Sequence, residues 1–233
     1  MIPLRDRAAR RRLTPANTLL IAANLAVFGY EVSLGPRIVP FADRYAMVPA
    51  RIAEALGAHP GFSVQVWPPG AMRALASIVT AMFIHGGFWH IAGNMLYLFI
   101  FGAAVEERMG TVRYLFFYFA AGIAAALATV WIDPASAVPV IGASGAIAGV
   151  LGAYFIFFPR GKILTIIPIF VFIEFVEIPA LVYLLLWFAV QLIAGLAEGG
   201  AGAAMGGVAW WAHVGGFLFG IAAAPVLARP RRR

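Results

Sequence analysis

Long apolar stretches separated by turn-forming or charged residues dominate this chain. Six of them approach the roughly 20 residues that a helix needs to cross the apolar core of a bilayer. They cover residues 17–34, 88–105, 112–132, 144–158, 178–197 and 208–228. The fourth stretch is short, and a short span is easiest to accommodate when its helix begins below the membrane surface in space lined by protein. The pattern predicts an all-α membrane protein with six transmembrane helices.

Two connecting segments have patterns of their own. Residues 35–87 carry several prolines and a moderately amphipathic piece at residues 49–56, which predict short helices lying in the membrane interface. Residues 163–177 are apolar but contain Pro168, Glu174 and Glu177. Because these residues break a continuous span, we expect an interfacial connection on the cytoplasmic side.

Composition and charge place the bundle in a membrane and orient it. The chain is 63% hydrophobic and 12% charged, far more apolar than an ordinary soluble domain. Arginines gather in residues 1–16 and 229–233, so the positive-inside tendency predicts that both are basic cytoplasmic tails flanking a membrane core at 17–228. Residues 35–87 then form a long outer loop. The net charge of +7 is explained by topology and by anionic lipid, and we expect no nucleic-acid partner.

Polar or ionisable residues lie at the beginnings of three predicted spans. The second, fourth and sixth spans all run from outside to inside, so His90, Ser144 and His213 share one level just under the outer surface. Tryptophans at the same level fit an outer aromatic belt: Trp89, Trp131, Trp210 and Trp211. Polar groups at membrane depth are costly and usually face a cavity or one another. We therefore expect these three residues to converge.

Small-residue faces indicate how they could meet. The faces consist of Gly142, Gly145, Gly149 and Gly152 in the fourth stretch and of Gly216 and Gly220 in the sixth. Such faces let helices touch backbone to backbone, which would bring Ser144 Oγ within hydrogen-bond reach of His213. His90 and Asn94 are four residues apart and share one helix face, from which both could donate hydrogen bonds to an oxyanion.

Each feature alone also has a simpler interpretation. A small-residue face is more often mere packing, and a lone histidine in a membrane is often structural or a proton relay. A nucleophile and a base in helices of membrane-spanning length together suggest peptide-bond hydrolysis within a membrane. Other chemistries for that reaction are poorly supplied: there is no cysteine and no His-Glu-x-x-His pattern, and Asp6, Asp43 and Asp133 are scattered. Serine chemistry without a metal or cofactor is the hypothesis that remains.

Several segments together resemble the rhomboid intramembrane serine proteases. They are residues 83–94 (FIHGGFWHIAGN), 101–102 (FG), 105–110 (VEERMG), 142–145 (GASG) and 212–216 (AHVGG) with Gly220. The resemblance implies a six-helix bundle with a water-filled cavity that opens outward. It implies Ser144 as nucleophile, His213 as general base, and an oxyanion hole made of His90, Asn94 and the Ser144 amide.

The same resemblance implies supporting residues, partners and a location. Arg108 would be a structural residue paired with Glu106, and we expect a structural role for His85. The packing glycines would be Gly145, Gly149, Gly216 and Gly220. The partners would be transmembrane protein substrates and the lipid bilayer, with no metal or cofactor, in a multi-pass protein of a membrane such as the bacterial inner (plasma) membrane.

Two departures from the family pattern affect the outer loop and the histidine. Met72 precedes Arg73 where many members have a Trp-Arg pair. Ala148 stands where some members have an aromatic residue that stacks on the catalytic histidine, so an aromatic side chain of a neighbouring helix would have to take that place. By resemblance alone, the fifth span, with Trp187 and Gln191, is the expected gate.

Two rival functions follow from the same sequence. The first is a catalytically silent rhomboid-like protein that binds transmembrane clients, against which the joint presence of Ser144, His213, His90 and Asn94 argues. The second is a transporter or channel, which would be expected to show a polar path through the full membrane depth. Here the polar groups stop near the outer side.

Overall fold

A computed structural model describes the chain except for residues 7–13, 58–69, 170–171, 198–207 and 230–233. In the described part, five helical segments are long and apolar enough to cross a membrane. Their elements are α1 (Pro15–Leu34) continuing through η1 (Gly35–Arg37) and α2 (Ile38–Tyr45); α5 (Phe88–Tyr97) with η3 (Leu98–Gly102) and α6 (Ala103–Met109); α7 (Thr111–Ile132); α9 (Ala180–Ala197); and α10 (Trp210–Leu227). Each corresponds to one of the predicted apolar stretches to within a few residues, although residues 178 and 179 of the fifth stretch belong to a strand, so five of the six predicted spans are long enough to cross.

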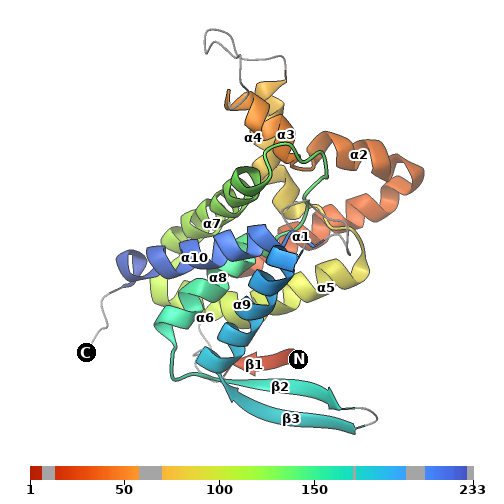
Figure 1. The fold of residues 1–233 in the computed structure, drawn as a ribbon. Coiled ribbons are helices and arrows are strands. Elements are labelled where there is room, and N and C mark those ends of the chain that lie inside the picture. The colour runs from red at the N-terminus through yellow and green to blue at the C-terminus, as the bar shows by residue number, and fades with distance from the viewer. Residues whose placement is uncertain (7–13, 58–69, 170–171, 198–207, 230–233) are drawn as a thin grey trace.

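The remaining predicted span is α8 (Ser144–Phe157), which is only 14 residues long. It packs against α7 and α10 (Figure 1). Most of its residues are buried. A helix enclosed by other helices does not need to reach both membrane surfaces, because protein rather than lipid surrounds its ends. The described part is therefore a mostly helical bundle with α8 inside it.

Short helices form the predicted outer loop. Besides η1 and α2, it contains α3 (Pro49–Ala55), α4 (Ala71–Thr80) and η2 (Ala81–Phe83). Ile52, Ile78 and Met82 form a small hydrophobic core with residues of α7. A short β-bridge between Met47 and Val140 ties this segment to the loop before α8. The predicted helices are confirmed, and they are packed onto the bundle.

A small antiparallel sheet corrects the all-α prediction. It has the strand order β1 (Ile2–Asp6), β2 (Lys162–Ile169) and β3 (Phe172–Pro179) and appears at the bottom of Figure 1. The segment at 163–177, predicted as an interfacial connection, lies in a hairpin of two strands, because its many β-branched residues suit a pleated strand. Asp6 is buried and accepts a hydrogen bond from Tyr154 at 2.6 Å, which fixes β1 against α8. Part of the expected basic tail is therefore a strand, while Arg7 and Arg10 to Arg12 lie outside the described residues.

Three buried polar side chains, which we call the Glu106 cluster, join the helix ends far from Ser144. Glu106 accepts hydrogen bonds from the backbone N–H groups of Ala16 at 3.2 Å and Asn17 at 2.7 Å, and so caps the start of α1. Asn17 accepts a hydrogen bond from Tyr114 at 2.8 Å and donates one to the Leu98 carbonyl at 3.1 Å. Asn17, Glu106 and Tyr114 thereby connect α1, η3, α6 and α7.

The expected pair of Glu106 and Arg108 is not formed. Glu106 uses both of its oxygens on the free N–H groups of α1, where a carboxylate is favoured by the helix dipole. Arg108 donates instead to the carbonyl of Arg229, and its guanidinium lies 5.5 Å from the centre of the Phe157 ring. Both residues support the structure, but each holds a different helix end.

Candidate functional site

One cavity of about 620 Å³ collects residues from four helices. Its lining includes His90 and Asn94 of α5, Ser144 of α8 and His213 of α10, together with Trp187 of α9. The four residues predicted to form the site therefore meet at one place.

Ser144 is the first residue of α8, and a constrained loop leads into it. Gly142, two residues earlier, has φ of +113°, a conformation that L side chains rarely adopt. A β-carbon at Gly142 would lie 2.7 Å from His90 Nε2 and 3.7 Å from Asn94 Nδ2. A glycine is needed here because of the positive φ and because the backbone before Ser144 lies too close to the His90 ring for a β-carbon. The first N–H groups of a helix lack intrahelical partners, so the Ser144 amide is free to point at a ligand.

His90 and Asn94 are arranged as hydrogen-bond donors. The Gly86 N–H donates to His90 Nδ1 at 3.2 Å, so in the neutral ring the proton is on Nε2. Asn94 is buried, and its Nδ2 has no partner among the described residues. Both groups lie on one face of α5, as their spacing predicted, and both have N–H groups available to an acceptor in the cavity.

His213 is held by a residue to which the sequence analysis gave no such role. Its Nδ1 is 2.7 Å from Oε1 of Gln191 on α9. A carboxamide oxygen only accepts, so Nδ1 carries the proton and Nε2 has the free lone pair. Nε2 is buried and has no hydrogen-bond partner in the described part of the chain. Nε2 of His213 therefore has a lone pair available to a hydrogen-bond donor in the cavity.

The predicted hydrogen bond between Ser144 and His213 is not formed. The two side chains face the same cavity, yet Nε2 of His213 is unpartnered. In enzymes without bound substrate such bonds are often long and tighten only in the reacting complex. Ser144 and His213 therefore line one cavity, but no hydrogen bond joins their side chains.

The predicted glycine contact between α8 and α10 is confirmed. A β-carbon at Gly216 would lie 2.1 Å from the Gly145 carbonyl oxygen, and one at Gly220 would lie 2.0 Å from the Gly149 carbonyl oxygen. Both distances are too short for any side chain, so the two backbones are in direct contact. This contact positions Ser144 and His213 at the ends of two adjoining helices.

An aromatic residue of a neighbouring helix takes the place left by Ala148. The Trp187 ring of α9 packs against the His213 ring, with centroids 5.9 Å apart and planes inclined by 36°. Trp210 contacts the same ring edge to face at 6.3 Å. His213 is thus enclosed by indoles, although α8 contributes none.

His85 lies beside the cavity, next to His90, and its hydrogen bonds suit a structural role. It is buried, its Nδ1 is 3.2 Å from the Phe83 carbonyl, and its backbone N–H donates to both oxygens of Glu31 at 3.2 Å. Burial and, to a smaller extent, the neighbouring His90 lower the pKa of His85 to about 4. It therefore remains neutral near pH 7.

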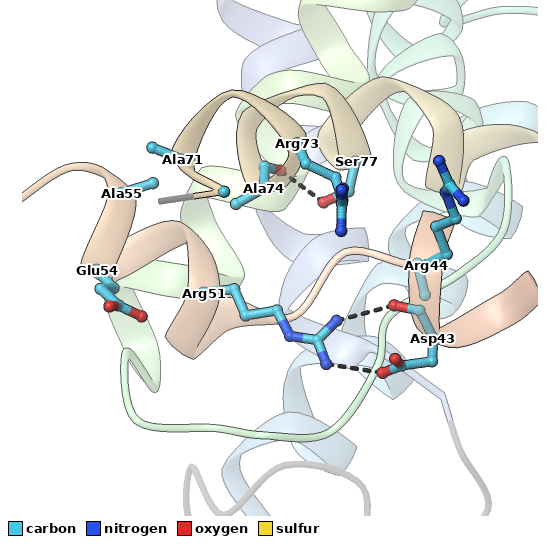
Figure 2. A pocket seen from close by; sticks show the side chains of 11 residues that line it. Asp43, Arg44, Arg51, Glu54, Ala55, Ala71, Arg73, Ala74 and Ser77 are labelled. Atoms are coloured by element: carbon cyan, nitrogen blue, oxygen red, sulfur yellow. Dashed lines mark hydrogen bonds and ion pairs between the residues drawn. The ribbon is translucent and has the colours of Figure 1, made fainter. Parts of the chain in front are cut away.

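A second hollow, of about 450 Å³, lies among the short helices α2, α3 and α4. Figure 2 shows charged side chains around it, namely Asp43, Arg44, Arg51, Glu54 and Arg73, with Ser77 on α4. Arg51 is occupied by two hydrogen bonds to Asp43, and the Ser77 hydroxyl donates to the Ala74 carbonyl. Since the Ser77 hydroxyl is bonded to a backbone carbonyl and no histidine is among the described residues that line this hollow, it is a weaker candidate for serine chemistry than the cavity at Ser144.

Gln191 is the site residue whose contact the sequence analysis missed. The feature of the sequence that could have indicated this contact is that Gln191 is a polar residue within an apolar span, one helical turn after Trp187. Such residues at membrane depth usually have a partner and a function. Its partner lies on another helix, so the spacing alone could not name it.

Comparisons with known proteins agree with the motifs. Residues 72–230 match the Rhomboid domain. In Saccharomyces cerevisiae, Rhomboid protein 1, mitochondrial, is 33% identical over 151 residues, which are 62% of this chain and 40% of that protein. In Bacillus subtilis, Rhomboid protease GluP is 43% identical over 76 residues, which are 33% of this chain and 14% of that protein.

A plant relative shows a similar extent of match. RHOMBOID-like protein 1 of Arabidopsis thaliana is 28% identical over 156 residues, which are 60% of this chain and 38% of that protein. The matched regions thus cover less than half the length of these relatives. The Rhomboid domain match, in contrast, spans more than half of this chain. On that match, the chain belongs to the rhomboid family.

Proposed function

We propose that this multi-pass membrane protein is a serine endopeptidase that cleaves transmembrane segments of other proteins near the outer membrane face. The observation that carries the proposal is the shared cavity in which Ser144, His213, His90 and Asn94 meet from three helices. Buried polar atoms are normally hydrogen-bonded, and unpartnered ones call for an explanation. Nε2 of His213 and Nδ2 of Asn94 are unpartnered in the described structure, as a site that receives a reacting peptide requires.

In the proposed reaction, Ser144 Oγ attacks the carbonyl carbon of a locally unwound substrate segment. Unwinding is needed because the carbonyls of an intact helix are hidden from attack. His213 Nε2 takes the serine proton, and the ring keeps its own proton on Nδ1. The carbonyl oxygen becomes an oxyanion that can accept from His90 Nε2–H, Asn94 Nδ2–H and the Ser144 amide.

Collapse of this intermediate breaks the peptide bond. His213 gives its Nε2 proton to the leaving amine, which leaves an ester between Ser144 and the new carboxyl end. A water molecule, deprotonated by His213, then hydrolyses the ester and restores the serine hydroxyl. Every proton that leaves one group arrives at another, so no metal or cofactor is needed.

The defining experiment compares two serine variants in proteoliposomes that contain a model transmembrane substrate. Ser144→Ala should abolish cleavage while the protein keeps its thermal unfolding midpoint. Ser33→Ala, which removes an exposed hydroxyl bonded only to the Tyr30 carbonyl, should cleave like the original protein. Full activity of Ser144→Ala would refute the assignment.

The open gap between Ser144 and His213 favours a second candidate, a catalytically silent rhomboid-like protein that binds transmembrane clients. A fluorophosphonate probe separates the two, because it labels only an activated serine. The protease should be labelled at Ser144, and labelling should fall as acid protonates His213. A protein that binds substrate but is never labelled would be the silent form.

The proposal includes an orientation. Both termini would be cytoplasmic and the cavity mouth would face outward, in a membrane such as the bacterial inner membrane. The support is the arginine excess at the two chain ends. Protease accessibility of tags placed at each terminus in sealed cells would test it, and digestion of either tag from outside would contradict it.

A further inference from the structure

We propose that Gln191 is a positioning residue for His213, doing with a neutral carboxamide what a carboxylate does in a three-residue serine protease site. The inference rests on the proposed function and adds a residue to it. Gln191 would hold the imidazole in the one tautomer and orientation that can accept the proton of Ser144.

The hydrogen bonds of the Gln191 amide determine its orientation. Its Nε2 donates to the Trp187 carbonyl at 3.2 Å, one helical turn earlier on α9. Rotating the amide by a half-turn would set an oxygen against that carbonyl and an N–H group against His213. With the amide as observed, Oε1 faces His213 Nδ1 at 2.7 Å and can only accept. The proton of the neutral ring must therefore sit on Nδ1.

The tautomer has a direct chemical consequence. With the proton on Nδ1, the lone pair is on Nε2, the nitrogen that is buried and unpartnered beside Ser144. With the proton on Nε2, the ring would present an N–H to Ser144 and could not act as its base. Gln191 thus selects the reactive form before any substrate arrives.

Two side chains of α9 restrain the same ring. Trp187 and Gln191 are four residues apart and share one helix face, so the indole covers the imidazole while the amide holds its edge. Gly195 continues this face, and a β-carbon there would lie 3.2 Å from the Trp211 ring. Gln191 is 6% exposed and His213 is 9% exposed, so water contributes little to fixing the ring.

A carboxamide suits this depth better than a carboxylate. A charged group inside a membrane costs several kcal/mol unless it is paired, whereas a neutral amide with both ends bonded costs much less. Of the described ionisable groups, His90 and Tyr97 of α5 line the same cavity as His213, and the Tyr97 hydroxyl is hydrogen-bonded to that of Tyr183. In the described structure, Gln191 is then the acceptor that holds Nδ1–H.

The test compares Gln191→Met, Gln191→Glu and the control Val190→Met. Methionine keeps the length of the side chain and removes the acceptor. Val190 is exposed on another face of α9, so Val190→Met introduces a methionine into the same helix away from His213. Cleavage and fluorophosphonate labelling are measured in proteoliposomes, and the histidine tautomer is measured by nitrogen NMR of protein with labelled histidine.

Gln191→Met should lower kcat and the labelling rate about 10- to 100-fold with KM changed less than twofold. Its His213 should lose the pure Nδ1–H tautomer. Gln191→Glu should recover much of the lost kcat, and its negative charge should move the acid limb of the pH profile to higher pH. Val190→Met should match the original protein in all of these measurements.

The outcomes separate the two proposals. If Gln191→Met keeps both the Nδ1–H tautomer and its kcat, the positioning role is wrong. If the original protein neither cleaves nor is labelled, the proposed protease function is wrong, while the NMR comparison still decides whether Gln191 sets the tautomer. A purely structural role would lower the thermal midpoint of Gln191→Met and leave the pH profile of Gln191→Glu unchanged, and that result would also overturn the proposal.

Discussion

Two groups of polar residues lie near opposite ends of the helix formed by α5, η3 and α6, and they differ in how completely their buried atoms are bonded. In the Glu106 cluster, every side-chain oxygen and nitrogen of Asn17, Glu106 and Tyr114 has a partner. We call His90, Asn94, Ser144 and His213 the Ser144 cluster. It leaves Asn94 Nδ2 and His213 Nε2 without partners in the described structure.

The difference separates stability from chemistry. A buried polar group that is fully bonded contributes to holding helices together, whereas an unpartnered one costs free energy. Such a cost is expected to persist where the unpartnered atoms form hydrogen bonds to a bound ligand or substrate. The comparison therefore predicts that changes in the Ser144 cluster lower activity and leave stability intact, and that changes in the Glu106 cluster do the reverse.

The largest expected effect is on activity, from Asn94→Ala. Removing one oxyanion donor lowers the rate about 100-fold or more. The unfolding midpoint should stay the same or rise, because the lost Nδ2 was buried without a partner. Asn24→Ala is the matched control, since it removes another buried asparagine, in α1, away from the cavity. Loss of stability without loss of cleavage in Asn94→Ala would remove the contrast between the clusters.

Acid should act on stability through His85, beside the Ser144 cluster. Its pKa is lowered from 6.5 to about 4, chiefly by burial, so the unfolded chain binds a proton that the folded protein rejects. The stabilising contribution is complete above pH 6.5 and is lost as the pH falls toward 4. The loss is on the order of 3 kcal/mol.

The variant His85→Asn isolates that contribution. Asparagine keeps a donor for the Phe83 carbonyl but does not titrate. The free energy of unfolding, measured by denaturant titration from pH 7 to pH 4, should fall less steeply in the variant. Parallel curves would mean that His85 is not kept neutral by the fold.

Sequence reasoning succeeded where local pattern determines the outcome. The apolar stretches gave the helix positions to within a few residues, and α8 begins at Ser144 as expected. The glycine faces predicted the contact of α8 with α10, because glycines at helical spacing permit close approach regardless of what else surrounds them. The positions of His90, Ser144 and His213 at one predicted depth indicated that these residues converge, and they line one cavity.

It failed where a partner distant in sequence determines the structure. The segment at 162–179 is a hairpin that pairs with Ile2–Asp6, and an apolar run alone does not distinguish a strand from a broken helix. Glu106 was assigned to Arg108, two residues away, but its bonds go to the start of α1. Gln191 on α9 contacts His213 on α10. Each miss concerns a hydrogen-bond partner, which composition and periodicity do not specify.

The Glu106 cluster should respond in stability to Glu106→Gln. The amide keeps the shape of the side chain, but its N–H group must face one of two backbone N–H groups that the carboxylate had bonded. A buried donor left unsatisfied costs about 2 kcal/mol, so the unfolding midpoint should fall while the cleavage rate per folded molecule stays constant. The control is Glu54→Gln, an exposed glutamate on α3. An unchanged midpoint would show that the cap on α1 is dispensable.

The smallest effect comes from two tyrosines one helical turn apart on α7. Tyr114→Phe removes the hydroxyl that donates to Asn17 and should cost about 1 kcal/mol of unfolding free energy. Tyr118→Phe removes an equally buried hydroxyl that lies beside the Asn24 side chain without forming a hydrogen bond of normal geometry in the described structure, so it should cost clearly less than Tyr114→Phe. Both substitutions delete the same atom from the same helix at the same burial. Equal costs in denaturant titrations would show that burial, rather than bonding, decides the value of a hydroxyl here, and the distinction between the two clusters would lose its basis.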